Sequence, residues 1–467
     1  MGDNDDRRIN RLPLSLCIGW GLGTLGISIM FNTLNILMQR FATDYLGVLA
    51  ITWGYIYLGA KIYDAVTDPV MGIISDHTRS RWGRRRPYLL LGGALAAMAF
   101  FGLFHVSPAA GGNHTVLLLV LLMLLYSTGY TIFNVPYMAM PAEMTSDYHA
   151  RSHLVSFRVY AIGFGTIAGL SVAPMLIGSL GGGKQGHESM ATIYALIILI
   201  TSFACFFMTR NAKQTVPERN SDLGFSQRVR LITANKPFLL LIGVKFAQLA
   251  GLAINQAALV YFIVHVLGKG YAFLGLYGLI ASICLLLAPP LCLYAGYRYD
   301  KRAIFIFSSL FYALTMLTWL FSGSEETTSL VLLRGALLGL SGGAMLMMGQ
   351  AMLPDTIGYD HARSGLNREG VFAGIYTTAE KLAFAFGGAL ASFTLGFMGY
   401  QSSTTGYAEQ PDSALVAIYL CMGVLPAVMA LLSYIFLLPY NLDERKIKEM
   451  GEKSGAIIAS SGNGNPG

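Results

Sequence analysis

The sequence predicts an all-α membrane protein in which twelve transmembrane helices form two six-helix halves. Only 12% of the 467 residues are charged and the mean hydropathy is +0.55, whereas a soluble domain carries roughly 25% charged residues. Apolar windows of membrane-spanning length recur along the chain, and basic residues gather in alternate segments between them. This composition excludes a soluble enzyme and a disordered chain.

The spans follow from the length of their apolar windows. A bilayer core of about 30 Å takes about 20 residues of α-helix per crossing. The five cysteines lie singly inside apolar stretches, which is typical of small buried side chains rather than of a metal site or a disulfide framework. The predicted spans are residues 13–39, 48–75, 88–108, 115–140, 153–179, 190–209, 238–267, 271–296, 303–322, 330–352, 370–398 and 412–438.

The distribution of lysine and arginine predicts the orientation. With both termini in the cytoplasm, 24 of the 32 Lys and Arg residues fall in cytoplasmic segments, four fall in or beside outer loops, and four lie within spans. One of the outer four is Arg40, just after the first span. The net charge of +7 is therefore a mark of topology, and we expect a bacterial inner (plasma) membrane protein with no nucleic-acid partner.

The chain divides into two similar halves. The motif Asp147-Tyr-His-Ala-Arg-Ser after the fourth span returns as Asp360-His-Ala-Arg-Ser after the tenth. Paired halves with a site between them are typical of secondary transporters. The predicted organisation is an N-terminal bundle at 1–209, a cytoplasmic central loop at 210–237, a C-terminal bundle at 238–440 and a flexible cytoplasmic tail at 441–467.

Charged residues inside the second span predict a cation site. Lys61, Asp64 and Asp68 share one helical face. Two carboxylates one turn apart repel each other, and a bound cation or a proton relieves the repulsion. Nearby hydroxyls complete the candidate cation-binding set of Asp64, Asp68, Thr67 and Thr131. The alternative is an ion pair of Lys61 with Asp64 that only ties helices together.

Further polar residues inside the spans predict a solute cavity. Pro136 interrupts the hydrogen bonds of the fourth span and frees backbone groups. Charges from several helices need partners in the low-dielectric interior, so purely structural pairing is the alternative. The candidate substrate-binding residues are Ser28, Asn32, Tyr130, Asn134, Met138, Arg158, Thr377, Glu380 and Lys381.

The loop after the second span predicts a conformational lock. Arginines beside helix ends can bridge to acidic groups and helix C-termini on neighbouring spans, and such pairs hold one state of a rocking transporter. Setting the topology alone is the alternative role. The candidate gating residues are Asp76, Arg79, Arg81 and Arg84 in this loop, and Asp355 and Asp360 after the tenth span.

Four stretches resemble the glycoside–pentoside–hexuronide:cation symporters, a branch of the major facilitator superfamily that includes melibiose permease. They read YDAVTDPVMG at 63–72, TRSRWG at 78–83, AMLPDTIGYD at 351–360 and EGVFAGIYTTAEK at 369–381. The resemblance implies the major facilitator fold and a cation site at Asp64, Asp68 and Thr131. It also places Tyr130, Arg158, Thr377 and Lys381 in the substrate cavity.

This chain departs from melibiose permease where sugar is bound. Ser28 and Asn134 stand in place of two sugar-binding aspartates, and Met138 replaces a tryptophan. The family's galactoside specificity is therefore not implied. Thr67 stands where melibiose permease has an asparagine near the cation, so Na⁺ and H⁺ both remain open.

The expected function is cation-coupled symport of a sugar, a glycoside or a related small organic solute by alternating access. The alternative is cation-coupled transport of an amphiphile such as a lysolipid. The histidines show no HExxH spacing, and no convincing nucleophile–base pair is visible, so an enzyme is disfavoured. We expect no cofactor besides the coupling Na⁺ or H⁺, and a functional monomer in the lipid bilayer.

Overall fold

The computed structural model describes residues 12–108, 113–145, 148–212, 235–364 and 369–442, and all regular structure within them is helical. The first half contains Leu14–Thr33 (α1), Gln39–Asp44 (α2), Ala50–His77 (α3), Pro87–His105 (α4), Asn113–Met144 (α5), Tyr148–Ile167 (α6), Ala173–Ser179 (α7) and Gly183–Thr209 (α8). The second half contains Lys236–Tyr261 (α10), Tyr271–Ala295 (α11), Lys301–Leu317 (α12), Thr328–Ala351 (α13), Leu353–Ser364 (α14), Glu369–Phe397 (α15), Asp412–Tyr419 (α16) and Leu425–Leu437 (α17).

Short irregular turns join some of these helices into longer rods. Four are π-helical turns, at Leu34–Met38, Ala168–Val172, Phe262–Val266 and Leu420–Val424, and one is a 3-10 turn at Thr318–Phe321. A π-helical turn accommodates one extra residue within a helix and is frequent at functional sites.

The all-α expectation is confirmed in the described residues, and helices occupy each of the twelve predicted ranges. Ten of them are long and apolar enough to cross a membrane by length and composition. Helices α3 and α15 are not among the ten, although they have 28 and 29 residues. These two helices carry five of the predicted intramembrane charges, Lys61, Asp64, Asp68, Glu380 and Lys381, whereas Arg158 lies on α6.

The predicted end of the first span was wrong by several residues. The rod continues through the π-helical turn at Leu34–Met38 into α2 and ends at Asp44. Arg40, which was expected in an outer loop, is therefore helical and only 3% exposed. The predicted central loop and tail lie largely outside the described residues, so their boundaries stay predictions, and Asp147 of the repeated motif also lies outside them.

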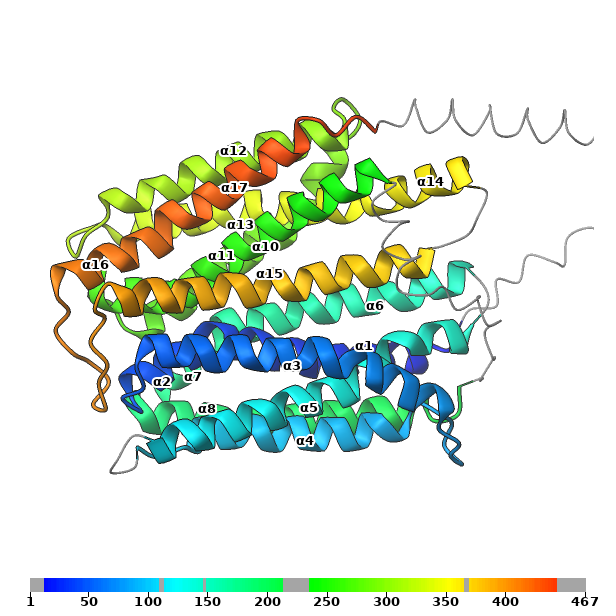
Figure 1. The fold of residues 1–467 in the computed structure, drawn as a ribbon, viewed down its shortest axis with the longest axis horizontal. Helices are drawn as coiled ribbons and strands as arrows, with labels where there is room; N and C mark the ends of the chain where they lie inside the picture. Colours follow the sequence, from blue (N-terminus) through cyan, green and yellow to red (C-terminus); the bar gives the residue numbers. More distant parts are fainter. Residues whose placement is uncertain (1–11, 109–112, 146–147, 213–234, 365–368, 443–467) are drawn as a thin grey trace, which may run out of the picture.

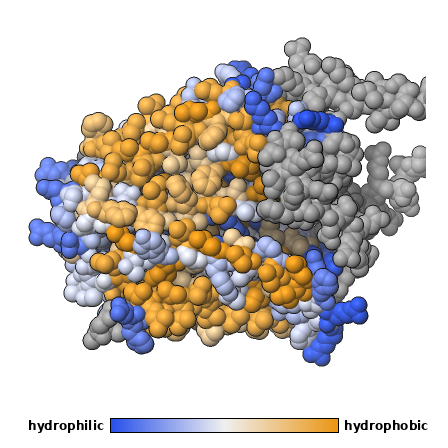
Figure 2. Space-filling view, viewed as in Figure 1, coloured by the Kyte–Doolittle hydropathy of each residue, from blue (hydrophilic) through white to orange (hydrophobic). Residues whose placement is uncertain are grey.

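The helices of the two halves lie side by side, with α1 to α8 in the lower part of Figure 1 and α10 to α17 in the upper part. Apolar residues cover the visible face of both halves, and hydrophilic residues gather toward the two ends of the molecule (Figure 2). This surface suits a bilayer across the middle of the molecule.

The two halves pack most tightly at the end formed by the start of α3 and the end of α15, on the left in Figure 1. A Cβ at Gly388 would lie 2.6 Å from the Tyr57 ring, and one at Gly396 would lie 2.8 Å from the Ile51 nitrogen. We call this end the closed end. Toward the opposite end of α15, Gly374 has open space beside it and Thr377 is exposed.

Candidate functional site

The predicted cation-site carboxylates lie between the two halves. Asp64 is buried, with Lys61 Nζ 3.6 Å from its Oδ2. The other oxygen of Asp64, Oδ1, is buried and has no hydrogen-bond partner among the described residues. Because an orphaned buried carboxylate oxygen is costly, this atom marks a place where a proton or a cation fits.

Asp68 connects the halves. The Thr131 hydroxyl on α5 donates a hydrogen bond of 2.9 Å to Asp68 Oδ1, and Lys381 on α15 pairs with Asp68 Oδ2. The lysine lies in the C-terminal half and the carboxylate in the N-terminal half. A rearrangement of the two halves therefore has to break or reform this ion pair.

Aromatic rings accompany both lysines. Lys61 Nζ lies 5.6 Å from the ring centroids of Phe31 and Tyr57, and Lys381 Nζ lies 5.7 Å from that of Tyr130. Ring faces stabilise a cation within about 6 Å. The lysines thus keep a second favourable contact if their carboxylates are taken by another ion.

Four other candidates bond to the backbone of their own helix or pack against a neighbouring helix. The Thr67 hydroxyl donates back to the Tyr63 carbonyl oxygen at 3.0 Å, and the Thr377 hydroxyl bonds the backbone of its own helix. Ser28 is buried against α6, and Asn32 donates to the Ser28 carbonyl oxygen at 2.8 Å.

The remaining candidates have partly open side chains. Asn134 and Arg158 are half-buried, and Met138 is exposed. Arg158 makes no hydrogen bond or ion pair with any residue that the structure describes. These side chains therefore leave polar and apolar surface free for a solute.

Glu380 belongs to a second charged cluster, within the C-terminal half. Lys245 Nζ on α10 lies 3.5 Å from Glu380 Oε1, and Gln350 Nε2 on α13 donates to the same oxygen at 3.2 Å. The sequence singled out Glu380 but did not indicate either partner.

The basic loop after α3 is bound within its own half. Arg84 pairs with Glu143 on α5 at 2.5 Å, and Arg85 pairs with Asp76 at 2.7 Å and with Glu143 at 3.2 Å. Sequence reasoning named Asp76 and Arg84 but missed Arg85 and Glu143. Arg79 is exposed.

The remaining gating candidates lie at the same end of the molecule. The Arg81 guanidinium lies 4.5 Å from the centroid of the Trp82 ring. In the other half, Asp355 pairs with Lys301 at 2.7 Å, and Asp360 is buried.

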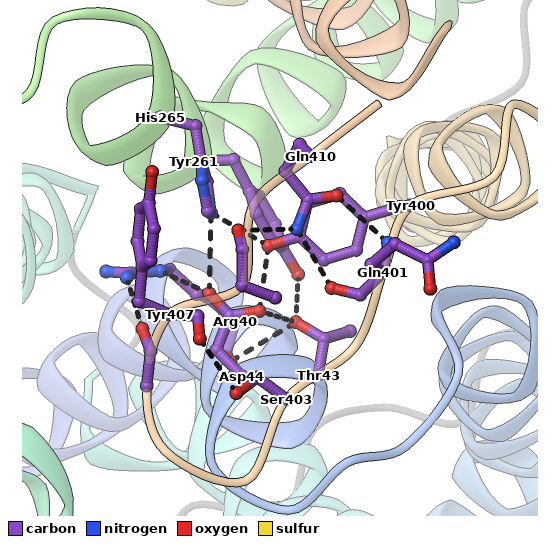
Figure 3. A network of polar contacts seen from close by, with 12 residues as sticks. Arg40, Thr43, Asp44, Tyr261, His265, Tyr400, Gln401, Ser403, Tyr407 and Gln410 are labelled. Carbon is purple, nitrogen blue, oxygen red and sulfur yellow. Dashed lines mark hydrogen bonds and ion pairs between the residues drawn. The ribbon is translucent and has the colours of Figure 1, made fainter. Parts of the chain in front are cut away.

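A polar network at the closed end was not predicted at all. We call Arg40, Thr43, Asp44, Tyr261, His265 and Tyr400 the closed-end network (Figure 3). Arg40 Nε donates to Asp44 Oδ2 at 2.8 Å, and the Tyr400 hydroxyl donates to Asp44 Oδ1 at the same distance. His265 Nε2 lies 3.7 Å from Asp44 Oδ2.

The closed-end network joins the two halves, because Tyr261, His265 and Tyr400 belong to the C-terminal half and the other three residues to the N-terminal half. The Thr43 and Tyr261 hydroxyls add a hydrogen bond of 2.8 Å, and Arg40 donates to the Tyr271 hydroxyl at 2.9 Å. Burial, reinforced by the Asp44 carboxylate, raises the pKa of Tyr400 far above its usual value, so its hydroxyl stays protonated and keeps donating. The network therefore fastens the halves together at this end.

Known proteins with similar sequences cover almost the whole chain. Residues 19–444 match the family described as MFS/sugar transport protein. The inner membrane symporter YicJ of Escherichia coli K12 is 28% identical over 93% of this chain and 94% of its own length. The isoprimeverose transporter of Lactiplantibacillus pentosus is 26% identical over 95% of this chain and 92% of its own.

Solved structures show the same fold. A D-xylose-proton symporter superposes with a TM-score of 0.65 at 17% identity, over 93% of this chain and 98% of that one. The expected major facilitator fold is confirmed, and the transporter family confirms that the chain is not an enzyme. The chain belongs to the MFS/sugar transport protein family.

Proposed function

We propose that this protein is a secondary active transporter that couples the uptake of a sugar or glycoside to the entry of a cation. Relatives named as a symporter and as an isoprimeverose transporter support this substrate class and the coupling. None of the proteins compared above is named for a lipid, so the lysolipid alternative gains no support.

The observation that carries the proposal is the pair of carboxylates on α3, each held by a lysine. Asp64 keeps one oxygen free, and Asp68 has the Thr131 hydroxyl beside it. Carboxylate and hydroxyl oxygens suit Na⁺, and the carboxylates alone suit a proton. A cation that enters here competes with Lys381 for Asp68 and so weakens an ion pair between the halves.

Alternating access follows from the unequal ends. If both termini lie in the cytoplasm, the closed end faces the outside, and the described conformation is the one open toward the cytoplasm. Outward opening breaks the closed-end network. Binding of cation and sugar together then makes up for the contacts that are lost.

We further propose a monomeric carrier in a bacterial inner membrane, with Na⁺ or H⁺ as the coupling ion. Uptake by purified protein in proteoliposomes, measured for a panel of sugars with and without Na⁺ and at two external pH values, identifies solute and ion. A Na⁺ gradient that drives accumulation at constant pH assigns Na⁺, and a pH gradient that drives it without Na⁺ assigns H⁺.

The test of the carboxylate site is Asp68→Asn. The variant removes the charge that the cation binds, so we expect concentrative uptake to be lost while equilibration down a sugar gradient remains. Asp412→Asn, an exposed acid at the start of α16, is the matched control and should accumulate sugar normally. Accumulation by Asp68→Asn at the wild-type level would refute the site.

A further inference from the structure

Glu380 has a carboxylate oxygen that no protein group occupies. Lys245 and Gln350 both contact Oε1, and Oε2 makes no hydrogen bond with any residue that the structure describes. The side chain is 27% exposed. Because an ionised group near the middle of a membrane span faces a cavity rather than lipid, we expect Oε2 to face the space between the two halves.

Lys245 is an unusual partner for this acid. Its side chain is 0% exposed, its Nζ has no hydrogen-bond partner in the part of the chain that the structure describes, and Glu380 is its ion-pair partner at 3.5 Å. An ion pair in which the lysine is fully buried and makes no hydrogen bond contributes no more to stability than a well-packed apolar pair. A contribution to the stability of the bundle therefore does not explain why this ion pair is present. Holding the ionised Glu380 carboxylate in one orientation does explain it.

The acids of the cation site are engaged differently. Asp68 is held on both oxygens by Thr131 and Lys381, and the free oxygen of Asp64 is buried. Glu380 is thus the acid at this level of the bundle that keeps an accessible acceptor.

We propose that Glu380 is a specificity-determining residue that accepts hydrogen bonds from sugar hydroxyls, with Gln350 beside it, and that Lys245 is its positioning residue. The proposal rests on sugar transport as the function. An ionised carboxylate accepts short, charge-assisted O–H···O bonds, and the amide of Gln350 adds a donor and an acceptor for a neighbouring hydroxyl. The preferred solute is a neutral polyhydroxylated sugar, because a carboxylate on the sugar would face Glu380 with like charge.

The test uses the full-length protein in proteoliposomes with four probes: methyl β-D-glucopyranoside, methyl β-D-xylopyranoside, melibiose and methyl β-D-glucopyranosiduronate. A lost hydrogen bond to a charged group raises KM for the neutral probes about 10- to 150-fold in Glu380→Gln, with a smaller change in kcat. In the same variant the ratio of kcat/KM for the glucoside to kcat/KM for the glucuronide becomes smaller. Lys245→Met also raises KM, whereas KM of Lys245→Arg lies closer to the wild-type value.

Two further variants separate recognition from folding. The double variant Lys245→Met/Glu380→Gln removes both charges of the pair and leaves no unpaired charge, so it keeps the wild-type unfolding temperature but not the wild-type KM. Glu188→Gln is the matched control, because Lys184 and Glu188 form an ion pair at the same 3.5 Å away from the cavity. Its KM stays unchanged.

The outcomes separate this inference from the proposed function. If wild-type protein transports at least one probe and KM is unchanged in Glu380→Gln and in the double variant, the role of Glu380 is refuted while sugar transport stands. If wild-type protein transports none of the sugars, the proposed function fails, and the inference fails with it.

Discussion

Tyr400→Phe should open the closed end. The substitution removes one hydroxyl that donates to Asp44 Oδ1 at 2.8 Å, while the Thr43 hydroxyl still donates to the same oxygen at 2.8 Å. Asp44 therefore keeps partners within its own half, and folding is spared. A hydrogen bond to a charged group contributes about 1.5–3 kcal/mol, so the open population should rise about 10- to 150-fold.

The measurement is the reaction of a cysteine at the closed end with a membrane-impermeant maleimide added from outside. Gln39 is buried beside the network in the described conformation, so Gln39→Cys in a background without the native cysteines reports opening. Because opening precedes labelling, the labelling rate follows the open population while that population is small.

Tyr261→Phe provides the comparison. It removes a bond between two neutral hydroxyls, Thr43 and Tyr261, at the same 2.8 Å, which contributes about 0.5–1.5 kcal/mol. The labelling rate should therefore rise only about 2- to 12-fold. Equal rates in Tyr400→Phe and wild type, or a larger effect in Tyr261→Phe, would contradict the assignment of Asp44 as the charged centre of this closure.

Other predictions concern the two ends and the buried charges. Asp64→Asn leaves Lys61, whose side chain is only 11% exposed, without its acid and should lower the free energy of unfolding by about 3–5 kcal/mol. Lys61→Met/Asp64→Asn should regain thermal stability but not ion-driven uptake, and equal unfolding temperatures for the two variants would argue against the pair. Gly388→Val drives two methyl groups toward the facing tyrosine ring, which already lies 2.6 Å from a Cβ position, and should raise outside labelling in the maleimide assay; a labelling rate at or below wild type would show that the closed end tolerates the bulk. Glu143→Gln weakens two arginine contacts in the loop after α3, so we expect a changed transport rate with little change in sugar affinity, and a change confined to affinity would point away from gating.

The sequence was sufficient for the architecture because membrane insertion depends on local composition. Ten helices meet the requirements of length and composition by themselves, and in α3 and α15 the charges stand out against apolar neighbours. The ends of the rods were less predictable. Arg40 and Asp44 look like a solvated loop, yet their charges pair one helical turn apart and are covered by the other half, which lets the helix continue.

The partners in the site could not be read from the chain. Lys61 and Asp64 are three residues apart, so their contact follows from helical geometry. Lys381 meets Asp68 across 313 positions, and that contact exists only because α3 and α15 lie side by side in the folded protein. The partners of Glu380 could not be predicted for the same reason, because Lys245 and Gln350 lie on helices that are distant in sequence.

If Asp68 binds the coupling cation as proposed, its ion pair with Lys381 also governs how the empty carrier returns to its starting conformation. A carrier that returns without solute must move its binding groups through the low-dielectric interior of the protein, where an unpaired charge is energetically costly. In the empty carrier the Lys381 ammonium would neutralise Asp68 in place of the coupling cation, which would allow the change of conformation. A cation that arrives without sugar would leave the Lys381 ammonium with only its contact to the Tyr130 ring, and the lost ion pair would discourage leakage of the cation down its gradient.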